Sequence, residues 1–142
     1  MDIRPLTDSY AVAPQITPED MAAIRAAGFT TVIDNRPDAE IPPDLRAGPM
    51  GEAARAAGLD FVVNPVVGGQ ITTENVTAQR DAMAAARGPV LAYCASGNRS
   101  SIVWALARAG TIGIDELIAI PARWGYNLEP FRPLLSDLAA RR

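Results

Sequence analysis

The stretch Pro89-Val90-Leu91-Ala92-Tyr93-Cys94-Ala95-Ser96-Gly97-Asn98-Arg99-Ser100-Ser101 decides the fold of this chain of 142 residues. Its first part is a short apolar run behind a Gly-Pro pair, which is typical of a buried strand. The run ends at Cys94, and the serine pair Ser100-Ser101 is expected to open a helix. The sequence therefore predicts a cysteine at the end of a buried strand, followed closely by a helix N-terminus.

Helix ends recur on both sides of this stretch. Four alanine-rich segments contain an arginine and finish in glycine, namely Gly28, Gly58, Gly88 and Gly110. Arginine in the last turn suits the negative end of the helix dipole, and glycine suits the position just after it. Apolar, β-branched or aromatic runs follow three of these glycines and predict strands at 29–33, 59–63 and 90–93. A first strand is expected at 10–13.

Helix starts are marked as well. Thr17 precedes Pro18 and two acidic residues, which is typical of an N-cap and a first turn. The other expected starts are Thr72 or Thr73 (for a helix to about Arg87), Asp115 and Glu129. A proline-rich loop is expected at 36–48. Helices that separate buried strands imply a mostly parallel sheet of four to five strands, covered on both faces. No linker divides the chain, so we predict one α/β domain over residues 1–142.

The composition excludes several classes of site. The chain has no histidine, no lysine and one cysteine, so it cannot build a Ser-His-Asp triad, a histidine-ligated metal site or an internal disulfide. We therefore expect no metal and no organic cofactor. A net charge of −3 offers no broad basic face for nucleic acid. No apolar run approaches the roughly 20 residues of a membrane span, and the N-terminus lacks the apolar core of a signal peptide. A lone cysteine also fits a reducing compartment, so we predict a cytoplasmic protein.

Ligands of parallel sheets bind beyond the carboxyl ends of the strands. Three predicted loops lie there, at 34–36, 64–70 and 94–99. In the third loop, backbone N–H groups can converge on one anion, and the positive end of the helix favours a thiolate. We predict Cys94 and Arg99 as catalytic residues: a nucleophile, and a bidentate fork for an oxyanion. The predicted anion-binding residues around them are Ala95, Ser96, Gly97, Asn98 and Ser100, with Gly97 allowing a tight loop and Ser100 donating to the thiolate.

Two further residues of the first loop are candidates for the same anion. Asp34 and Arg36 follow a predicted strand on the same side of the sheet, where Arg36 could add a second anion contact. The alternative is a salt-bridged loop with no part in binding. Gly68-Gly69-Gln70 could shape the mouth of the site or form a simple turn. Trp104 and the segment 124–126 are expected to serve packing.

A resemblance adds to this interpretation. The stretch Tyr93-Cys94-Ala95-Ser96-Gly97-Asn98-Arg99-Ser100 is similar to the active-site loop of rhodanese-type sulfurtransferases. The whole chain resembles the phosphatase-like domain of the beta-lactamase hydrolase-like proteins, through residues 12–16, 28–38, 65–71 and 88–100. The resemblance implies a fold similar to that of dual-specificity phosphatases. It leaves the reaction open between phosphatase and sulfurtransferase, and it implies a separate sulfur dioxygenase as a candidate partner.

Two features of the sequence favour sulfur transfer. Four residues separate Cys94 from Arg99, as in rhodanese-like loops, whereas the phosphatase signature has five. The loop at 64–70 contains no acid to protonate a leaving alkoxide, and Glu74 is better suited to the first turn of a helix. We therefore predict that Cys94 takes a sulfur atom from a sulfane donor and passes it to an external thiol. The alternative is a phosphatase that forms a Cys94 phosphocysteine, and the third candidate is a non-catalytic anion-binding module.

Overall fold

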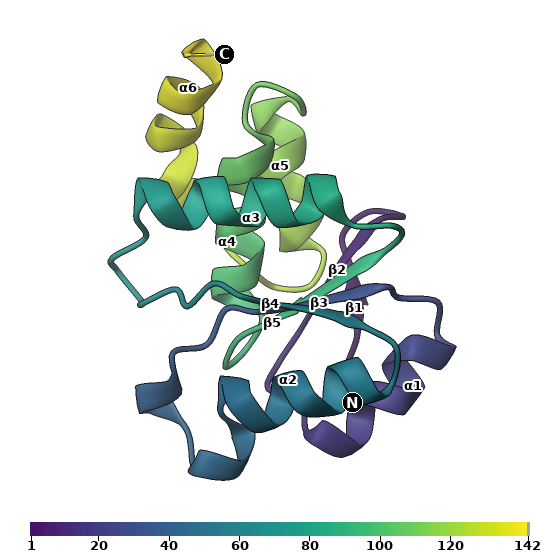
Figure 1. Cartoon of the computed structure of the whole chain (residues 1–142). Coiled ribbons are helices and arrows are strands. Elements are labelled where there is room, and N and C mark those ends of the chain that lie inside the picture. The colour runs from purple at the N-terminus through teal and green to yellow at the C-terminus, as the bar shows by residue number, and fades with distance from the viewer. Residues whose placement is uncertain (142) are drawn as a thin grey trace.

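Five strands form one sheet in the order β1-β2-β5-β3-β4 in the computed structural model, which describes residues 1–141 (Figure 1). The strands are β1 Arg4–Pro5, β2 Tyr10–Ala13, β3 Thr31–Asp34, β4 Asp60–Val63 and β5 Val90–Tyr93. Only the pair β1–β2 is antiparallel. The predicted α/β fold with a mostly parallel sheet is therefore confirmed. Residue 142, the last of the predicted domain range, lies outside the described residues.

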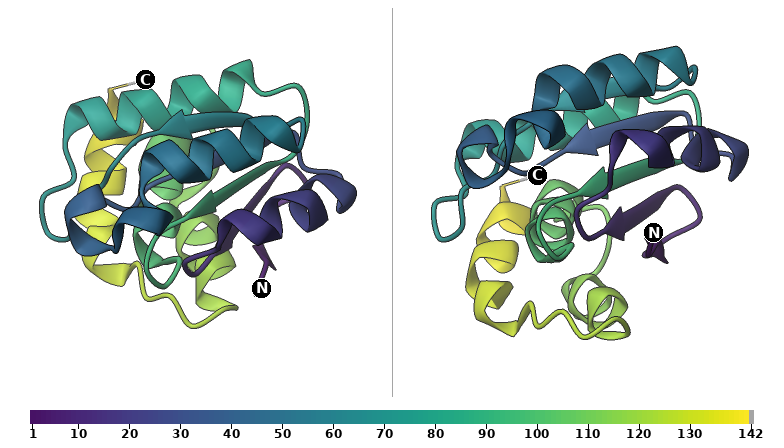
Figure 2. Two further views of the ribbon diagram at one scale, coloured as in Figure 1. Left: turned by 60° about the horizontal axis from the view of Figure 1, so that its bottom comes forward. Right: turned by 90° about the horizontal axis from the view of Figure 1, so that it is seen from below.

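Helices cover both faces of this sheet. They are α1 Met21–Ala26, α2 Ala47–Ala56, α3 Thr73–Ala85, α4 Asn98–Arg108, α5 Ile114–Ala122 and α6 Arg132–Ala140. Figures 1 and 2 show α1 and α2 on one face and α3 and α4 on the other, with α5 and α6 outside α4. Four short 3-10 helices also occur within residues 1–141: η1 Pro18–Asp20, η2 Asp38–Glu40, η3 Pro43–Leu45 and η4 Glu129–Phe131.

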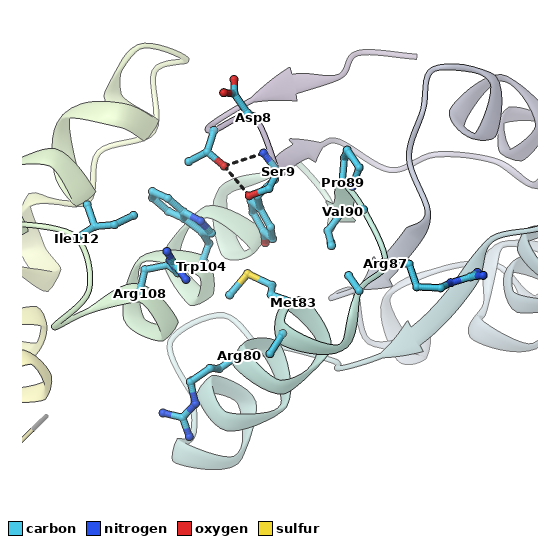
Figure 3. Close-up of a pocket in the computed structure, with 15 residues that line it drawn as sticks. Asp8, Ser9, Arg80, Met83, Arg87, Pro89, Val90, Trp104, Arg108 and Ile112 are labelled. Atoms are coloured by element: carbon cyan, nitrogen blue, oxygen red, sulfur yellow. Dashed lines mark hydrogen bonds between the residues drawn. The ribbon is translucent and has the colours of Figure 1, made fainter.

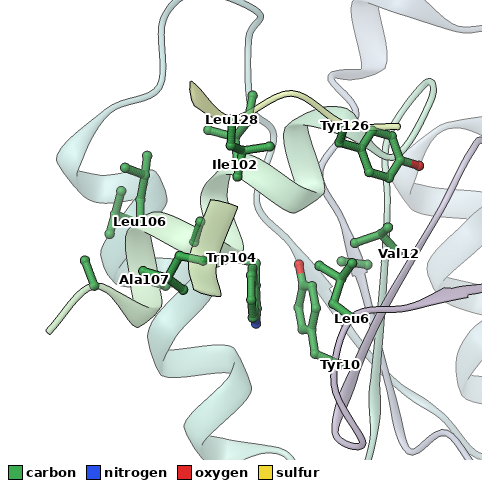
Figure 4. Packing of buried hydrophobic residues seen from close by; sticks show 14 of the residues in the cluster. Leu6, Tyr10, Val12, Ile102, Trp104, Leu106, Ala107, Tyr126 and Leu128 are labelled. Carbon is green, nitrogen blue, oxygen red and sulfur yellow. The ribbon is translucent and has the colours of Figure 1, made fainter. Parts of the chain in front are cut away.

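The core consists of two apolar clusters, one on each face of the sheet. The alternation along β3 and β5 explains the division, because Val32 and Leu91 face α1 and α2 while Ile33 and Ala92 face α3 and α4. In the larger cluster the rings of Tyr10 and Trp104 stack with their centroids 6.1 Å apart (Figure 4). The predicted packing role of Trp104 is confirmed, since only 1% of it is exposed.

The strand order places β5 in the middle of the sheet. The chain runs from β2 to β3 and outward to β4, and then returns to fill the position between β2 and β3. The end of β5 therefore lies where the strand order reverses, which is the usual place of a ligand site in open parallel sheets. Ala13 and Asp34 flank Tyr93 in the parallel register, so the three strands end side by side.

Several predicted boundaries shift. The strand predicted from Phe29 begins at Thr31, because that residue is the first to pair with β5. The helix expected to reach about Arg87 ends at Ala85, since Ala86 adopts an extended conformation. The predicted loop at 36–48 contains η2 and η3, and its last two residues begin α2. The two-residue strand β1 was not predicted, because so short a segment carries no alternation. Within residues 1–141, no helix is both long and apolar enough to cross a bilayer.

Candidate active site

Cys94 follows the last residue of β5 and is fully buried. The N–H group of Gly97 donates to its Sγ atom over 3.1 Å, so the loop folds back onto the sulfur. Gly97 is the N-cap of α4 and has a φ of 94°, in the left-handed region that favours glycine. A Cβ atom at this position would also collide with the hydroxyl of Tyr126. The structure thus places the predicted strand, cysteine and helix N-terminus together, with the helix starting at Asn98 rather than at Ser100.

Two backbone amide groups of this loop are unpaired among the described residues. Neither Ala95 nor Ser96 donates its N–H to an acceptor within residues 1–141. Their carbonyl groups accept hydrogen bonds from residues outside the loop. The N–H of Gln15 donates to Ala95 O over 3.3 Å, and the Tyr126 hydroxyl donates to Ser96 O over 2.7 Å. Unpaired N–H groups at a helix N-terminus form a site for an anion. The predicted anion-binding roles of these loop residues therefore have a suitable geometry.

Tyr126 belongs to this site, although its sequence context predicted packing only. Its hydroxyl accepts a hydrogen bond of 2.6 Å from the Arg4 guanidinium while it donates to Ser96. The side chain thereby links the N-terminal strand and the segment after α5 to the loop. Sequence reasoning missed it because residue 126 is far along the chain from residue 96, and only the tertiary fold brings the two together. Trp124, from the same segment, is 43% exposed instead of packed.

Arg99 is paired with a carboxylate that the sequence did not single out. Its two terminal nitrogens each donate over 2.8 Å to one oxygen of Glu40, which lies at the end of η2. One of these nitrogens also donates to Val66 O over 2.7 Å. The hydrogen bonds from Arg99 lower the pKa of Glu40, and those to Glu40 raise the pKa of Arg99. Glu40 is therefore an anion that already occupies the guanidinium fork.

Arg36 meets the same carboxylate. Its Nε donates over 3.3 Å to Oε1 of Glu40, and one of its terminal nitrogens donates to Gln15 over 3.3 Å. Of the two predictions for Arg36, a salt-bridged loop describes this geometry. A second anion contact is compatible with it, since Arg36 and Arg99 converge on one carboxylate. Nothing in the local sequence marks Glu40 for this place, because it lies 59 residues from Arg99.

Ser100 differs from its predicted role. Its buried hydroxyl donates to Asn35 Oδ1 over 2.9 Å, and no hydrogen bond joins it to Cys94. Asn35 belongs to a buried polar network that includes Gln79, Asn64 and Tyr10. In this network, Gln79 of α3 accepts from both asparagines over 2.9 Å and donates to the Tyr10 hydroxyl over 2.9 Å. Such bonds fix the ends of β3 and β4 against α3 and α4.

Asp34 is fully buried, which conflicts with its predicted contact to a ligand. Its Oδ1 atom accepts from the Arg36 N–H over 2.9 Å and so shapes the turn after β3. Its Oδ2 atom and the hydroxyl of the neighbouring Tyr93 are enclosed without a hydrogen-bond partner. Burial raises the pKa of Asp34 to about 6, and it raises the pKa of Tyr93 as well. Asp34 is therefore placed to support the loop rather than to touch an anion.

The replacement Asp34→Asn is expected to stabilise the protein at neutral pH. The folded pKa of about 6 lies above the ordinary value of 3.8, so folding favours the protonated carboxyl. Its contribution to stability is greatest below about pH 4 and declines as the pH rises through 6. At about 1.4 kcal/mol for each pKa unit, wild type should lose about 2 to 3 kcal/mol relative to Asp34→Asn between pH 4 and pH 7.

Urea unfolding of both proteins across this range measures the difference, and subtraction removes the contribution of every other titrating group. Asp44→Asn serves as the control, because Asp44 is exposed in η3 and its side chain forms no hydrogen bond or ion pair within residues 1–141. A constant difference between wild type and Asp34→Asn from pH 4 to pH 7 would contradict the raised pKa.

The loop at 64–70 contacts Arg99 but contains no acidic residue. It contributes the Val66 carbonyl to Arg99 and the Asn64 side chain to the buried network. Gly68 and Gly69 form an exposed turn, with a hydrogen bond of 3.0 Å from Gln70 N to Val67 O. Glu74 is exposed in the first turn of α3, as the sequence suggested. No cluster of three metal-ligating side chains exists within residues 1–141.

Comparison with known proteins places this site in a wider context. Residues 2–111 match the family model "Beta-lactamase hydrolase-like protein, phosphatase-like domain". The beta-lactamase hydrolase-like protein of Agrobacterium fabrum is 35% identical over 125 residues, which cover 87% of this chain and 29% of that protein. The chain thus spans about 30% of the length of the curated relatives it matches.

Solved structures share the fold over nearly the whole chain. A crystal structure from Neisseria meningitidis Z2491, which bears a provisional phosphatase name, is 34% identical, with a TM-score of 0.82 over 97% of this chain and 99% of that one. The catalytic domain of the PP-IP phosphatase SIW14 from S. cerevisiae has a TM-score of 0.71, covering 94% of this chain and 83% of that one. At 11% identity the yeast enzyme shows similarity of fold alone.

Proposed function

Because the chain belongs to the family of phosphatase-like domains of beta-lactamase hydrolase-like proteins, we propose that it is a cysteine-dependent phosphatase. Its substrates are phosphate monoesters whose leaving group departs without a proton, such as aryl phosphates. This differs from the leading interpretation of the sequence, which was sulfur transfer. The fold shared with phosphatases and the 34% identity to the Neisseria protein favour phosphate hydrolysis.

One observation carries the proposal: the loop after β5 donates one backbone N–H to the sulfur of Cys94 and leaves two neighbouring amides unpaired in the described part of the chain. Gly97 N–H donates to Sγ over 3.1 Å, and the amides of Ala95 and Ser96 have no other acceptor within residues 1–141. Arg99 adds a planar pair of donors next to this loop. Donors fixed before the reaction stabilise charge as it develops in the transition state.

The reaction proceeds in two steps. The Cys94 thiolate attacks phosphorus, a new S–P bond forms, and the ester oxygen leaves with the bonding electron pair as an aryloxide. Water then attacks the phosphorus of the phosphocysteine, which releases inorganic phosphate and returns the electron pair to sulfur. In both steps the equatorial oxygens accept hydrogen bonds from the loop amides and Arg99.

The absence of an acid from the loop at 64–70 limits the substrates. An alkyl alkoxide needs a proton donor in order to leave, whereas a phenolate, with a pKa of about 10 for its acid, departs far more readily. Glu40 does not supply the proton, because Arg99 lowers its pKa and keeps it ionised. We therefore expect aryl phosphates to be hydrolysed much faster than alkyl phosphates.

Sulfur transfer stays as the second candidate, because the loop has four residues between Cys94 and Arg99. In that reaction the thiolate attacks the outer sulfur of thiosulfate, and sulfite leaves with the electrons of the S–S bond. An external thiol would then accept the sulfur, since the chain has no second cysteine. A separate sulfur dioxygenase that consumes the product persulfide belongs to this candidate.

Trapping the covalent intermediate separates the two reactions. The chain is mixed with 4-nitrophenyl phosphate or with thiosulfate, quenched in acid and measured by intact mass spectrometry. We expect the mass of one phosphoryl group on Cys94 in the first case and no stable sulfur adduct in the second, with no adduct on Cys94→Ser. A sulfur adduct that passes to glutathione, together with no phosphate release, would establish sulfur transfer and overturn the phosphatase proposal.

Removal of the Glu40 carboxylate tests whether this carboxylate competes with a bound anion for Arg99. In Glu40→Gln the guanidinium of Arg99 loses its internal anion but keeps Val66 O as an anchor. A partly exposed ion pair contributes at most about 1 kcal/mol, so affinity for inorganic phosphate should rise by up to about fivefold. Competitive inhibition of aryl phosphate hydrolysis by phosphate measures the change. Glu74→Gln, at an exposed carboxylate in α3, is the matched control. Weaker inhibition of Glu40→Gln by phosphate would mean that Glu40 positions Arg99 instead of competing with phosphate for it.

A further inference from the structure

A cavity lies at the opposite end of the sheet from Cys94. Its volume is about 610 Å³, within the range of about 300–1,000 Å³ that small-molecule pockets have. Tyr10 and Val90, the first residues of β2 and β5, form its floor, and α3 and α4 form its walls. The proposed phosphatase reaction makes no use of it, because Cys94 follows the other end of β5.

Cationic and apolar side chains line this cavity, together with the exposed carboxylate of Asp8 (Figure 3). Arg80 of α3 and Arg108 of α4 line it, and neither forms an ion pair or hydrogen bond through its side chain within residues 1–141. Arg87 also lines it, but is paired with the exposed Asp60 over 3.2 Å. Two unpaired guanidinium groups outweigh the single carboxylate of Asp8 in this lining, so the cavity is positively charged although the net charge of the chain is −3. They favour an anionic ligand.

Trp104 gives an independent indication of a ligand. The residue is 99% buried, yet its indole N–H has no acceptor within residues 1–141, whereas that of Trp124 donates to Pro5 O over 2.8 Å. The only fully enclosed, unpaired side-chain polar atoms among the described residues belong to Asp34 and Tyr93, so the Trp104 nitrogen is open to the cavity that it lines. Figure 3 shows it beside Arg108 and Met83. A buried indole N–H normally finds a hydrogen-bond partner.

We infer that this cavity binds a small, soluble amphipathic anion. Its carboxylate, or another planar oxyanion, accepts from the guanidinium groups of Arg80 and Arg108 and from the indole of Trp104. Its hydrocarbon part packs against Met83 and Ile112, which line the same space. The proposal is independent of the reaction at Cys94, and binding is measured without any assay of activity.

NMR titration of the indole N–H resonance of Trp104 tests this site, with Trp124→Phe used to assign the two indole signals. The probes are octanoate below its micellar concentration, the neutral octanamide, and inorganic phosphate. We expect octanoate to shift the Trp104 signal saturably, while octanamide and phosphate bind at least about tenfold more weakly, since one lacks the charge and the other the apolar part.

Matched variants locate the charge requirement. Arg80→Gln and Arg108→Gln are each expected to weaken octanoate binding by about tenfold, and Arg25→Gln, at an exposed arginine of α1, should leave it unchanged. Arg80 is exposed and unpaired, so its replacement carries no risk to folding. The proposal fails if octanoate produces no saturable shift, if octanamide or phosphate binds as tightly, or if Arg25→Gln weakens binding as much as Arg80→Gln.

Discussion

Cys94→Ser is expected to lower kcat/KM for aryl phosphate hydrolysis by at least about a thousandfold, because the substitution removes the nucleophile of both steps. A serine hydroxyl would need a general base in order to attack, and the chain has no histidine. The buried position of residue 94 and the Gly97 N–H donor would remain, but a neutral hydroxyl gains little from that donor. Steady-state kinetics with 4-nitrophenyl phosphate measure the loss.

The loop should still bind an anion in this variant. The amides of Ala95 and Ser96 and the guanidinium of Arg99 are unchanged, so phosphate is expected to protect Cys94→Ser and wild type equally against thermal unfolding. Ser101→Ala is the matched control, because Ser101 is equally buried and only donates to Gly97 O over 2.8 Å. Hydrolysis by Cys94→Ser at the wild-type rate would overturn the assignment of Cys94 and favour an anion-binding module with another role.

Arg99→Lys is expected to reduce kcat/KM by about a hundredfold, the usual cost of removing one donor to a developing oxyanion. A lysine keeps the positive charge but offers a point charge in place of a planar fork, so it cannot hold two oxygens at once. The stability of the fold should change by less than about 1 kcal/mol, because the ion pair with Glu40 is partly exposed. Kinetics and urea unfolding of the same preparation separate the two effects.

Arg36→Lys is the natural comparison for this second prediction. Arg36 meets the same Glu40 carboxylate, but through a longer contact of 3.3 Å and from the loop after β3 instead of from α4. Its replacement is expected to change kcat/KM by less than about threefold, the scale of an exposed ion pair. Equal losses in Arg36→Lys and Arg99→Lys would contradict the assignment of Arg99 as the principal oxyanion donor and would make both arginines parts of one site.

Local sequence patterns were sufficient for the central part of the site. The apolar run at 90–93, the cysteine after it and the glycine three residues later are close neighbours in the sequence. Local backbone preferences are therefore enough to predict how they are arranged. The same reasoning located two of the four parallel strands without error and the other two to within two residues. It also excluded histidine-dependent chemistry, which depends on composition alone.

The choice between reactions needed more than these patterns. The four-residue loop and the acid-free segment at 64–70 favoured sulfur transfer, but they are single features of a short motif. The similarity to phosphatases extends over nearly the whole chain and so includes the strand order and the helices around the loop. For that reason it has greater weight in the proposed function than the loop length does.

The sequence by itself determined that a cysteine follows a buried strand and closely precedes a helix N-terminus, and that no histidine of this chain can take part in its chemistry. Only the tertiary structure decided that Glu40 pairs with the guanidinium of Arg99, that Tyr126 donates a hydrogen bond to the loop, and that Ser100 donates to Asn35. The physical reason is distance along the chain. Backbone preferences act between near neighbours, whereas these contacts join residues 30 to 65 positions apart that meet only when the sheet brings the strand ends together.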